Sequence, residues 1–77
     1  MDFPQFRKRF DNKSYYMIIN DRAFEEVQLI GNKVFIHMIK ADKYFEIIRI
    51  QQMLEGTDQL YLCSSKEEYE KVKTLNA

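Results

Sequence analysis

The sequence predicts an α+β protein with an antiparallel sheet of about five strands and a short helix at each end. Three observations predict this class: short apolar segments rich in aromatic and β-branched residues fill the middle, turn-forming residues separate them, and helical spacing appears at both ends. With 77 residues, of which 45% are hydrophobic, the chain is expected to form one small folded domain over residues 1–77.

The first element is expected to be a short helix. Phe3, Phe6 and Phe10 recur at i, i+3 and i+7, which is the spacing of one helical face. Asp2 and Pro4 suit a first helical turn. Such a helix would be only about two turns long, so its Phe stripe would need to pack on the sheet.

Five strands are expected next in the sequence. The segments are Tyr15–Ile19, Phe24–Ile30, Val34–Ile39, Tyr44–Ile50 and Leu60–Cys63. Between the second and third segments, Gly31-Asn32 predicts a two-residue hairpin turn of the primed type. That turn fixes the register and places Val27 opposite Ile36 and Leu29 opposite Val34. The strands are expected to follow one another as a meander, either open or curled into a small barrel.

The last element is expected to be a second helix. Ser65 and Glu68 have the spacing of a capping box, in which each side chain bonds the other residue's backbone N–H. Tyr69, Val72 and Leu75 then give the helix an apolar edge. Both helices are expected to cover one face of the sheet, and the alternative is that they are split between its two faces.

The hairpin register separates two faces of the expected sheet. The predicted core face carries an almost unbroken apolar set: Val27, Leu29, Val34, Ile36, Met38, Phe45 and Ile47. The other face is mixed and carries Phe24, Glu26, Gln28, Phe35, His37, Ile39, Tyr44, Glu46, Ile48 and Ile50. Two interpretations of the mixed face stay open: it forms a second small core, or part of it is an exposed interface.

The mixed face predicts a non-enzymatic protein–protein interaction module, in the manner of a small regulator or inhibitor. The expected partner is another protein or a second copy of the chain, which would make a homodimer. No small-molecule substrate is evident. The residues expected to bind the partner are Phe35, Tyr44, Ile48, Ile50 and His37.

No catalytic, metal or cofactor motif is found in the sequence, and an enzyme is not expected. The register places His37 between Glu26 and Glu46, where an ion-paired surface histidine is the simpler interpretation and a partial metal site the other. The single cysteine, Cys63, excludes an internal disulfide and a four-ligand zinc finger, and two glycines are too few for a phosphate-binding loop.

The alternative function is nucleic-acid binding by the basic N-terminal helix. Its candidate residues are Arg7, Lys8, Arg9 and Lys13. Tyr15 and Tyr16 lie nearby, and at most one of them could stack on a base because they point to opposite faces of a strand. Twelve basic against twelve acidic residues give the chain no overall positive field for phosphates or for an anionic membrane surface. The apolar runs are far shorter than the ~18 residues of a membrane-spanning helix, so a soluble cytoplasmic protein is expected.

Overall fold

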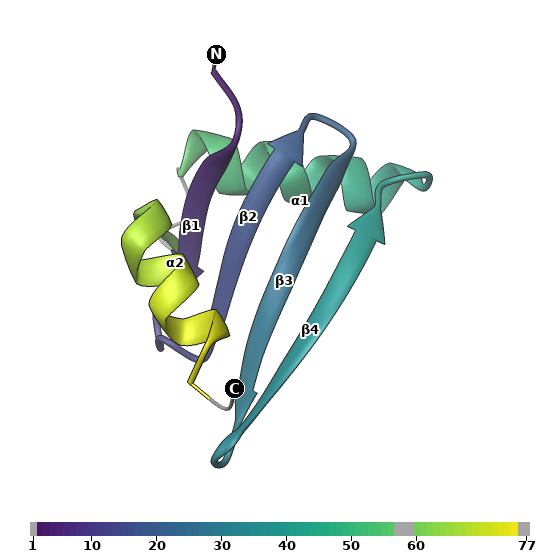
Figure 1. Cartoon of the computed structure of the whole chain (residues 1–77). Coiled ribbons are helices and arrows are strands. Elements are labelled where there is room, and N and C mark those ends of the chain that lie inside the picture. The colour runs from purple at the N-terminus through teal and green to yellow at the C-terminus, as the bar shows by residue number, and fades with distance from the viewer. Residues whose placement is uncertain (1, 57–59, 76–77) are drawn as a thin grey trace.

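The computed structural model describes residues 2–56 and 60–75 and contains a five-stranded antiparallel sheet and two helices (Figure 1). The α+β class is therefore confirmed. The elements in chain order are β1 (Gln5–Arg9), β2 (Ser14–Asn20), β3 (Ala23–Ile30), β4 (Lys33–Lys40), α1 (Tyr44–Glu55), β5 (Tyr61–Cys63) and α2 (Lys66–Lys73).

The strands lie in the order β4-β3-β2-β1-β5. The first four form a meander of consecutive antiparallel hairpins. The chain then runs through α1 and returns as β5, which pairs with β1, so Cys63 lies opposite Arg7. The meander prediction therefore holds for four strands, and β4 and β5 form the two edges.

The hairpin at Gly31-Asn32 has the predicted register. Val27 lies opposite Ile36, and Leu29 lies opposite Val34. Gly31 has a φ of +62°, in the left-handed region that side chains with a branched Cβ avoid. The turn and the pairing that it fixes could therefore be predicted from local sequence.

Replacing Gly31 with valine is expected to lower the free energy of unfolding by about 1 kcal/mol or more, because valine is strained at this φ. No atom lies within 4 Å of an added Cβ, so the backbone conformation alone causes the loss. Urea denaturation measures it, with Gly31→Asn as the control because asparagine tolerates positive φ. Equal stability of the two variants would contradict the assignment of strain to this turn.

The predicted N-terminal helix is wrong, because residues 5–9 form strand β1. β1 pairs with β2 on one side and β5 on the other, which satisfies its backbone groups in the sheet. Of the three phenylalanines at helical spacing, Phe6 packs on Tyr69, whereas Phe3 and Phe10 are 38% and 52% exposed. The Phe spacing therefore did not mark a buried helical face.

The predicted strand at Tyr44–Ile50 is also wrong, because this segment begins helix α1. The carboxylate of Glu46 accepts a hydrogen bond from the Lys43 N–H at the start of the helix. At its end, Gly56 has a φ of 65°, and its N–H donates to the Gln52 carbonyl. The apolar residues that face the sheet recur at helical spacing and are Ile47, Ile50, Met53 and Leu54.

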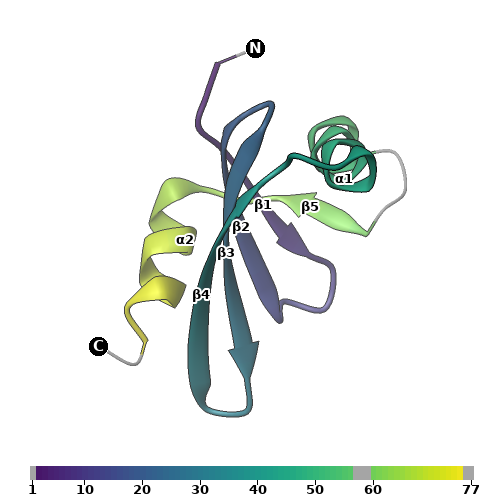
Figure 2. The ribbon, with the colours of Figure 1, turned by 90° about the vertical axis from the view of Figure 1, so that its right-hand side faces the viewer.

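The two helices lie on opposite faces of the sheet, and the prediction that both cover one face is wrong (Figure 2). The core under α1 contains Tyr16, Ile18, Phe24, Ala41, Ile50 and Met53. The core under α2 contains Tyr15, Val27, Tyr69 and Val72. A sheet with apolar residues on both faces needs a cover on each, and one helix supplies each cover.

This arrangement corrects the predicted core face. Val27 is fully buried under α2, with Leu29 and Val34 packed beside it. Ile36 and Met38, on the outermost strand, are instead 48% and 55% exposed because the short helix α2 does not cover them. Two further residues of the predicted core face lie on α1. Phe45 is 67% exposed, and Ile47 packs on the core under α1.

Candidate functional site

The outer edge of β4 is open in the described parts of the chain, because β4 pairs with β3 alone. Figure 2 looks onto this edge, and neither helix lies in front of it. The strand is eight residues long and follows β3 without a register shift. An open strand edge presents a row of N–H and C=O groups to which another strand can add.

The hydrogen-bond pattern identifies the backbone groups that point away from the sheet. The Ala41 N–H donates to the Arg22 carbonyl at 2.7 Å and continues the β3–β4 register by two residues. Since hydrogen-bonded positions alternate along an antiparallel pair, the odd-numbered residues of β4 bond to β3. The outward N–H and C=O groups therefore belong to Val34, Ile36, Met38 and Lys40.

Exposed apolar side chains surround these outward groups. Phe35 is 40% exposed, and Ile36 and Met38 are about half exposed. Tyr44 and Phe45, at 79% and 67%, begin α1 directly beyond the end of β4. We define the β4 edge surface as the exposed side chains of Phe35, Ile36, His37, Met38, Tyr44 and Phe45.

This edge lacks most of the features that protect strand edges from pairing. Proteins commonly use short strands, bulges, prolines or charged side chains for protection. On β4 the charged residues are Lys33 and Lys40, one at each end, and the six residues between them contain neither acid nor proline. The opposite edge, β5, is only three residues long. β4 is therefore the better site for an added strand.

Three of the five residues predicted to bind a partner lie on the β4 edge surface: Phe35, His37 and Tyr44. Ile48 is half-buried on α1. Ile50 is fully buried in the core under α1, so the prediction that it lies on an exposed surface is wrong. The mixed face is thus divided between a second core near β3 and an exposed margin at β4.

The sequence reasoning missed Ile36, Met38 and Phe45, which it assigned to the core. Helical spacing of the apolar residues after Lys43 was the available signal for Phe45, because that spacing leaves position 45 off the buried stripe. No sequence signal separated Ile36 from Val27, its buried neighbour across the hairpin. Their difference depends on which strand lies at the edge.

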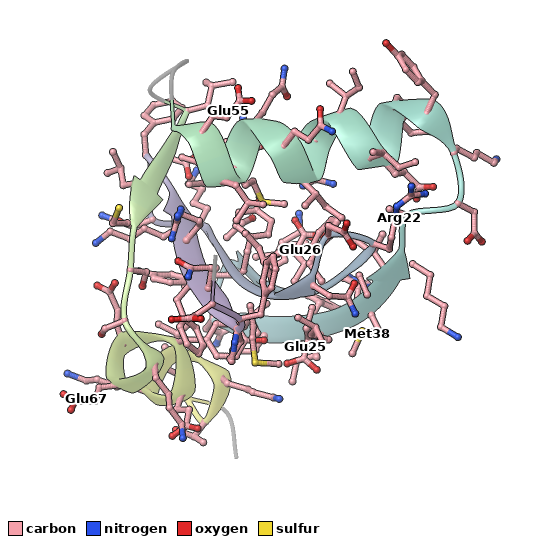
Figure 3. The ribbon with its side chains drawn as sticks, turned by 90° about the horizontal axis from the view of Figure 1, so that it is seen from above. Arg22, Glu25, Glu26, Met38, Glu55 and Glu67 are labelled. Carbon is pink, nitrogen blue, oxygen red and sulfur yellow. The ribbon has the colours of Figure 1, made fainter. Side chains whose placement is uncertain are left out.

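His37 lies opposite Glu26, as the register predicted. Glu26 points into the space between the sheet and α1 (Figure 3) and pairs with Arg49 at 3.3 Å. Glu46 is in the first turn of α1, where it bonds the Lys43 backbone, so its predicted position beside His37 on a strand is wrong. Within residues 2–56 and 60–75, no group of three His, Cys, Asp or Glu side chains could hold a metal ion.

The side chain of Arg49 is held over the core under α1 by aromatic contacts. Its guanidinium lies 5.5 Å from the ring centre of Tyr16 and 5.3 Å from that of Phe24. It also donates to the Tyr16 hydroxyl at 3.3 Å. Burial raises the pKa of the Tyr16 hydroxyl. This cluster anchors the middle of α1 to β2 and β3.

A second polar cluster holds α2 to the other face, where Glu25 points away from α1 (Figure 3). The Tyr69 hydroxyl and the Lys73 ammonium both donate to the Glu25 carboxylate, the latter at 2.7 Å. Burial, reinforced by the charge of Glu25, raises the pKa of Tyr69. Burial alone would raise the pKa of Glu25, but its hydrogen bonds and the charge of Lys73 lower it. These shifts follow from helix docking and need no catalytic role.

The candidate nucleic-acid residues lie on a strand rather than a helix, so Arg7 and Lys8 point to opposite faces of the sheet. On the α1 side, the Arg7 Nε donates to the Met53 carbonyl at 2.9 Å. On the α2 side, Lys8 pairs with Glu68 at 3.1 Å. The structure therefore divides this basic cluster between two faces.

The other two candidate nucleic-acid residues are Arg9, at the end of β1, and Lys13, in the turn that follows it. Arg9 pairs with Asp11 at 3.5 Å. The backbone N–H of Lys13 donates to the same Asp11 side chain at 3.0 Å, and its own side chain is exposed. These contacts give the turn after β1 its shape and add no continuous basic surface.

Comparisons with protein-family models, with curated proteins and with solved structures find no match for this chain. Neither of the described helices has the length and apolar character needed to cross a lipid bilayer.

Proposed function

We propose that this chain is a non-enzymatic protein–protein interaction module, acting as a small regulator or inhibitor through its β4 edge surface. One observation carries the proposal: an open eight-residue strand edge is surrounded by exposed Ile36, Met38 and aromatic side chains. Main-chain pairing at such an edge gives affinity, and the side chains beside it give specificity.

The exposed aromatic rings supply contact area at this edge. Taking about 200 Å² for each ring, Phe35, Tyr44 and Phe45 together leave about 370 Å² in contact with solvent. Aromatic residues and methionine are enriched in the centres of protein interfaces, and charged residues are depleted there. The β4 edge surface has this composition, with its two lysines at the ends of the strand.

The nucleic-acid alternative has no comparable surface. Its binding would need several cations facing one strand of phosphates. Arg7 and Lys8 instead face opposite sides of the sheet, and Lys8 and Arg9 pair with acidic side chains of the same chain. No observation favours this function over the first.

Replacing Ile36 and Met38 together with lysine is expected to abolish partner binding without unfolding the chain. Lysine on an edge strand opposes addition of another strand. Because both side chains are about half exposed, stability should change by no more than about 1 kcal/mol. Binding is measured by introducing a benzophenone amino acid at Tyr44 and photo-cross-linking in the cells that produce the protein.

The matched control replaces Leu62 and Leu75 with lysine. These residues are 42% and 59% exposed and belong to β5 and to the turn after α2, so neither is part of β4. The Tyr44 adduct should persist in this control and disappear in the Ile36→Lys, Met38→Lys variant. An adduct of equal yield in both variants, or none in the wild type, would refute the proposed function.

A further inference from the structure

We infer that the partner of the β4 edge is β4 of a second copy of this chain, paired antiparallel about a two-fold axis at His37. The inference rests on the proposed function and specifies its partner. Figure 2 shows the edge that the two copies would share. Such a dimer would continue one antiparallel sheet across both copies.

Symmetry restricts the registers that two identical strands can adopt. A two-fold axis that pairs them antiparallel must run perpendicular to the sheet, so side chains facing each other lie on the same side of both copies. Facing residues therefore have numbers of the same parity. The axis must pass through a residue of β4 rather than between two residues.

An axis at His37 pairs every outward backbone group of β4. Val34 then faces Lys40 of the second copy, and Ile36 faces Met38. These four residues are the ones whose N–H and C=O groups point away from β3. A two-fold axis at Ile36 would instead place Lys40 opposite the Gly31-Asn32 turn of the second copy. The register at His37 is therefore the one that satisfies the whole edge.

The same register brings compatible side chains together. On the side of α1, Phe35 faces Ile39 of the second copy, and on the other side Ile36 faces Met38. Lys33 and Lys40 lie on opposite faces of the strand, so the two lysines never face each other across the axis. In this register Lys33 instead faces Ala41 of the second copy, so it meets no like charge there.

The exposed area is appropriate for a small dimer. Two copies together contribute at most about 740 Å² from their aromatic rings at about 200 Å² per ring, an area that includes Tyr44 and Phe45 at the start of α1 and does not yet count Ile36 and Met38. Stable specific interfaces begin near about 1,200 Å² in total. Adding the two apolar side chains and the backbone of eight residues from each copy brings the interface toward this size.

A symmetric β4 pair also closes the assembly. If β4 paired with β5 of another copy, each new copy would leave one β4 and one β5 edge open, and open chains would form. β5 provides only three residues for such pairing, against eight in β4. The isologous pair uses the longer edge twice and leaves only short edges exposed.

The test is disulfide cross-linking of His37→Cys in a Cys63→Ser background, which removes the exposed native thiol. The backbone N–H and C=O of His37 bond to β3, so His37 would face His37 of the second copy at a non-hydrogen-bonded position. Cα atoms at such a position lie about 4.5 Å apart, which is within the range of a disulfide. Mild air oxidation removes one electron and one proton from each thiol, and oxygen is reduced. The product is read on a non-reducing gel.

The cross-linked dimer of His37→Cys is expected to form about 100-fold faster than the cross-linked dimer of Lys33→Cys at ~10 μM protein. The reason is that the two introduced thiols in the paired strands have an effective concentration of about 1 mM. Lys33 is the control because it is exposed on the same strand but lies far from its symmetry mate. Sedimentation of the wild type should give twice the mass of one chain.

Two outcomes would overturn the inference: equal cross-linking rates at the two positions, or a wild type that sediments as a monomer at every concentration. The symmetric dimer can be refuted without refuting the proposed function. A monomer whose Tyr44 photo-adduct with another protein is lost in Ile36→Lys, Met38→Lys would refute the symmetric dimer and keep the interaction module. Circular dichroism of the cysteine variants confirms that each is folded.

Discussion

Phe24→Ala is expected to remove a large share of the free energy of unfolding. The side chain is fully buried under α1, packs edge-on against Tyr16 at 6.0 Å between ring centres, and lies below the guanidinium of Arg49. Truncating a buried phenylalanine costs about 3–5 kcal/mol. A chain of this length has a total stability of only about 4–12 kcal/mol. Urea denaturation followed by circular dichroism measures the loss.

Phe35→Ala is the matched control for this prediction. Phe35 lies on the neighbouring strand and on the same side of the sheet, but it is 40% exposed. Its truncation should cost far less stability and should weaken partner binding instead. If both variants lost the same stability, the division of the mixed face into a core and an exposed margin would be wrong.

Tyr69→Ala is expected to release α2 from the sheet. Tyr69 is 2% exposed, packs on Phe6 with ring centres 5.6 Å apart, and donates its hydroxyl hydrogen bond to Glu25. Loss of this side chain should cost about 3–5 kcal/mol, as for other large buried residues. It would also leave the Glu25 carboxylate with Lys73 as its remaining side-chain donor. Hydrogen exchange of the α2 amides, together with urea denaturation, measures the release.

Tyr69→Phe separates packing from hydrogen bonding in the same place. It keeps the ring and removes the hydroxyl, so it should cost about 1.5–3 kcal/mol through the loss of one hydrogen bond to a charged acceptor. Protection of the α2 amides should then largely survive. If phenylalanine were as damaging as alanine, the hydrogen bond rather than the ring would hold α2 on the sheet.

The parts of the fold that could be predicted from sequence depend on local chemistry. Gly31 requires a positive φ, and that requirement fixed both a turn and eight cross-strand pairs. Likewise, the Ser65 hydroxyl accepts a hydrogen bond from the Glu68 N–H, as its position before an apolar helix predicted. In both cases the deciding contacts lie within a few residues of each other.

The errors came from segments whose conformation depends on distant parts of the chain. Residues 5–9 are a strand because β2 and β5 pair with them, and β5 lies at the other end of the sequence. Residues 44–50 contain β-branched and aromatic side chains that favour a strand locally. Ile50 and Met53 become buried together only in a helix that crosses the sheet.

The candidate surface was predictable only in part for the same reason. The exposure of Phe35 and His37 follows from their position on β4, and the sequence register placed them together on one face. It gave no indication that β4 would be an edge, since that depends on where β5 pairs. The strand order therefore decides which apolar residues are available to a partner.

The pairing of β5 with β1 determines the order in which the sheet can be completed during synthesis. Strands β1–β4 follow one another closely, so each hairpin can pair soon after it emerges. The outer side of β1 stays unpaired until Tyr61–Cys63 has been made, after nearly the whole sheet and α1. Before β5 pairs, the sheet therefore has two open edges, at β4 and at β1, and the edge at β1 is temporary because β5 later covers it. Until β5 docks, the unpaired backbone of β1 is a site through which incompletely folded chains can aggregate.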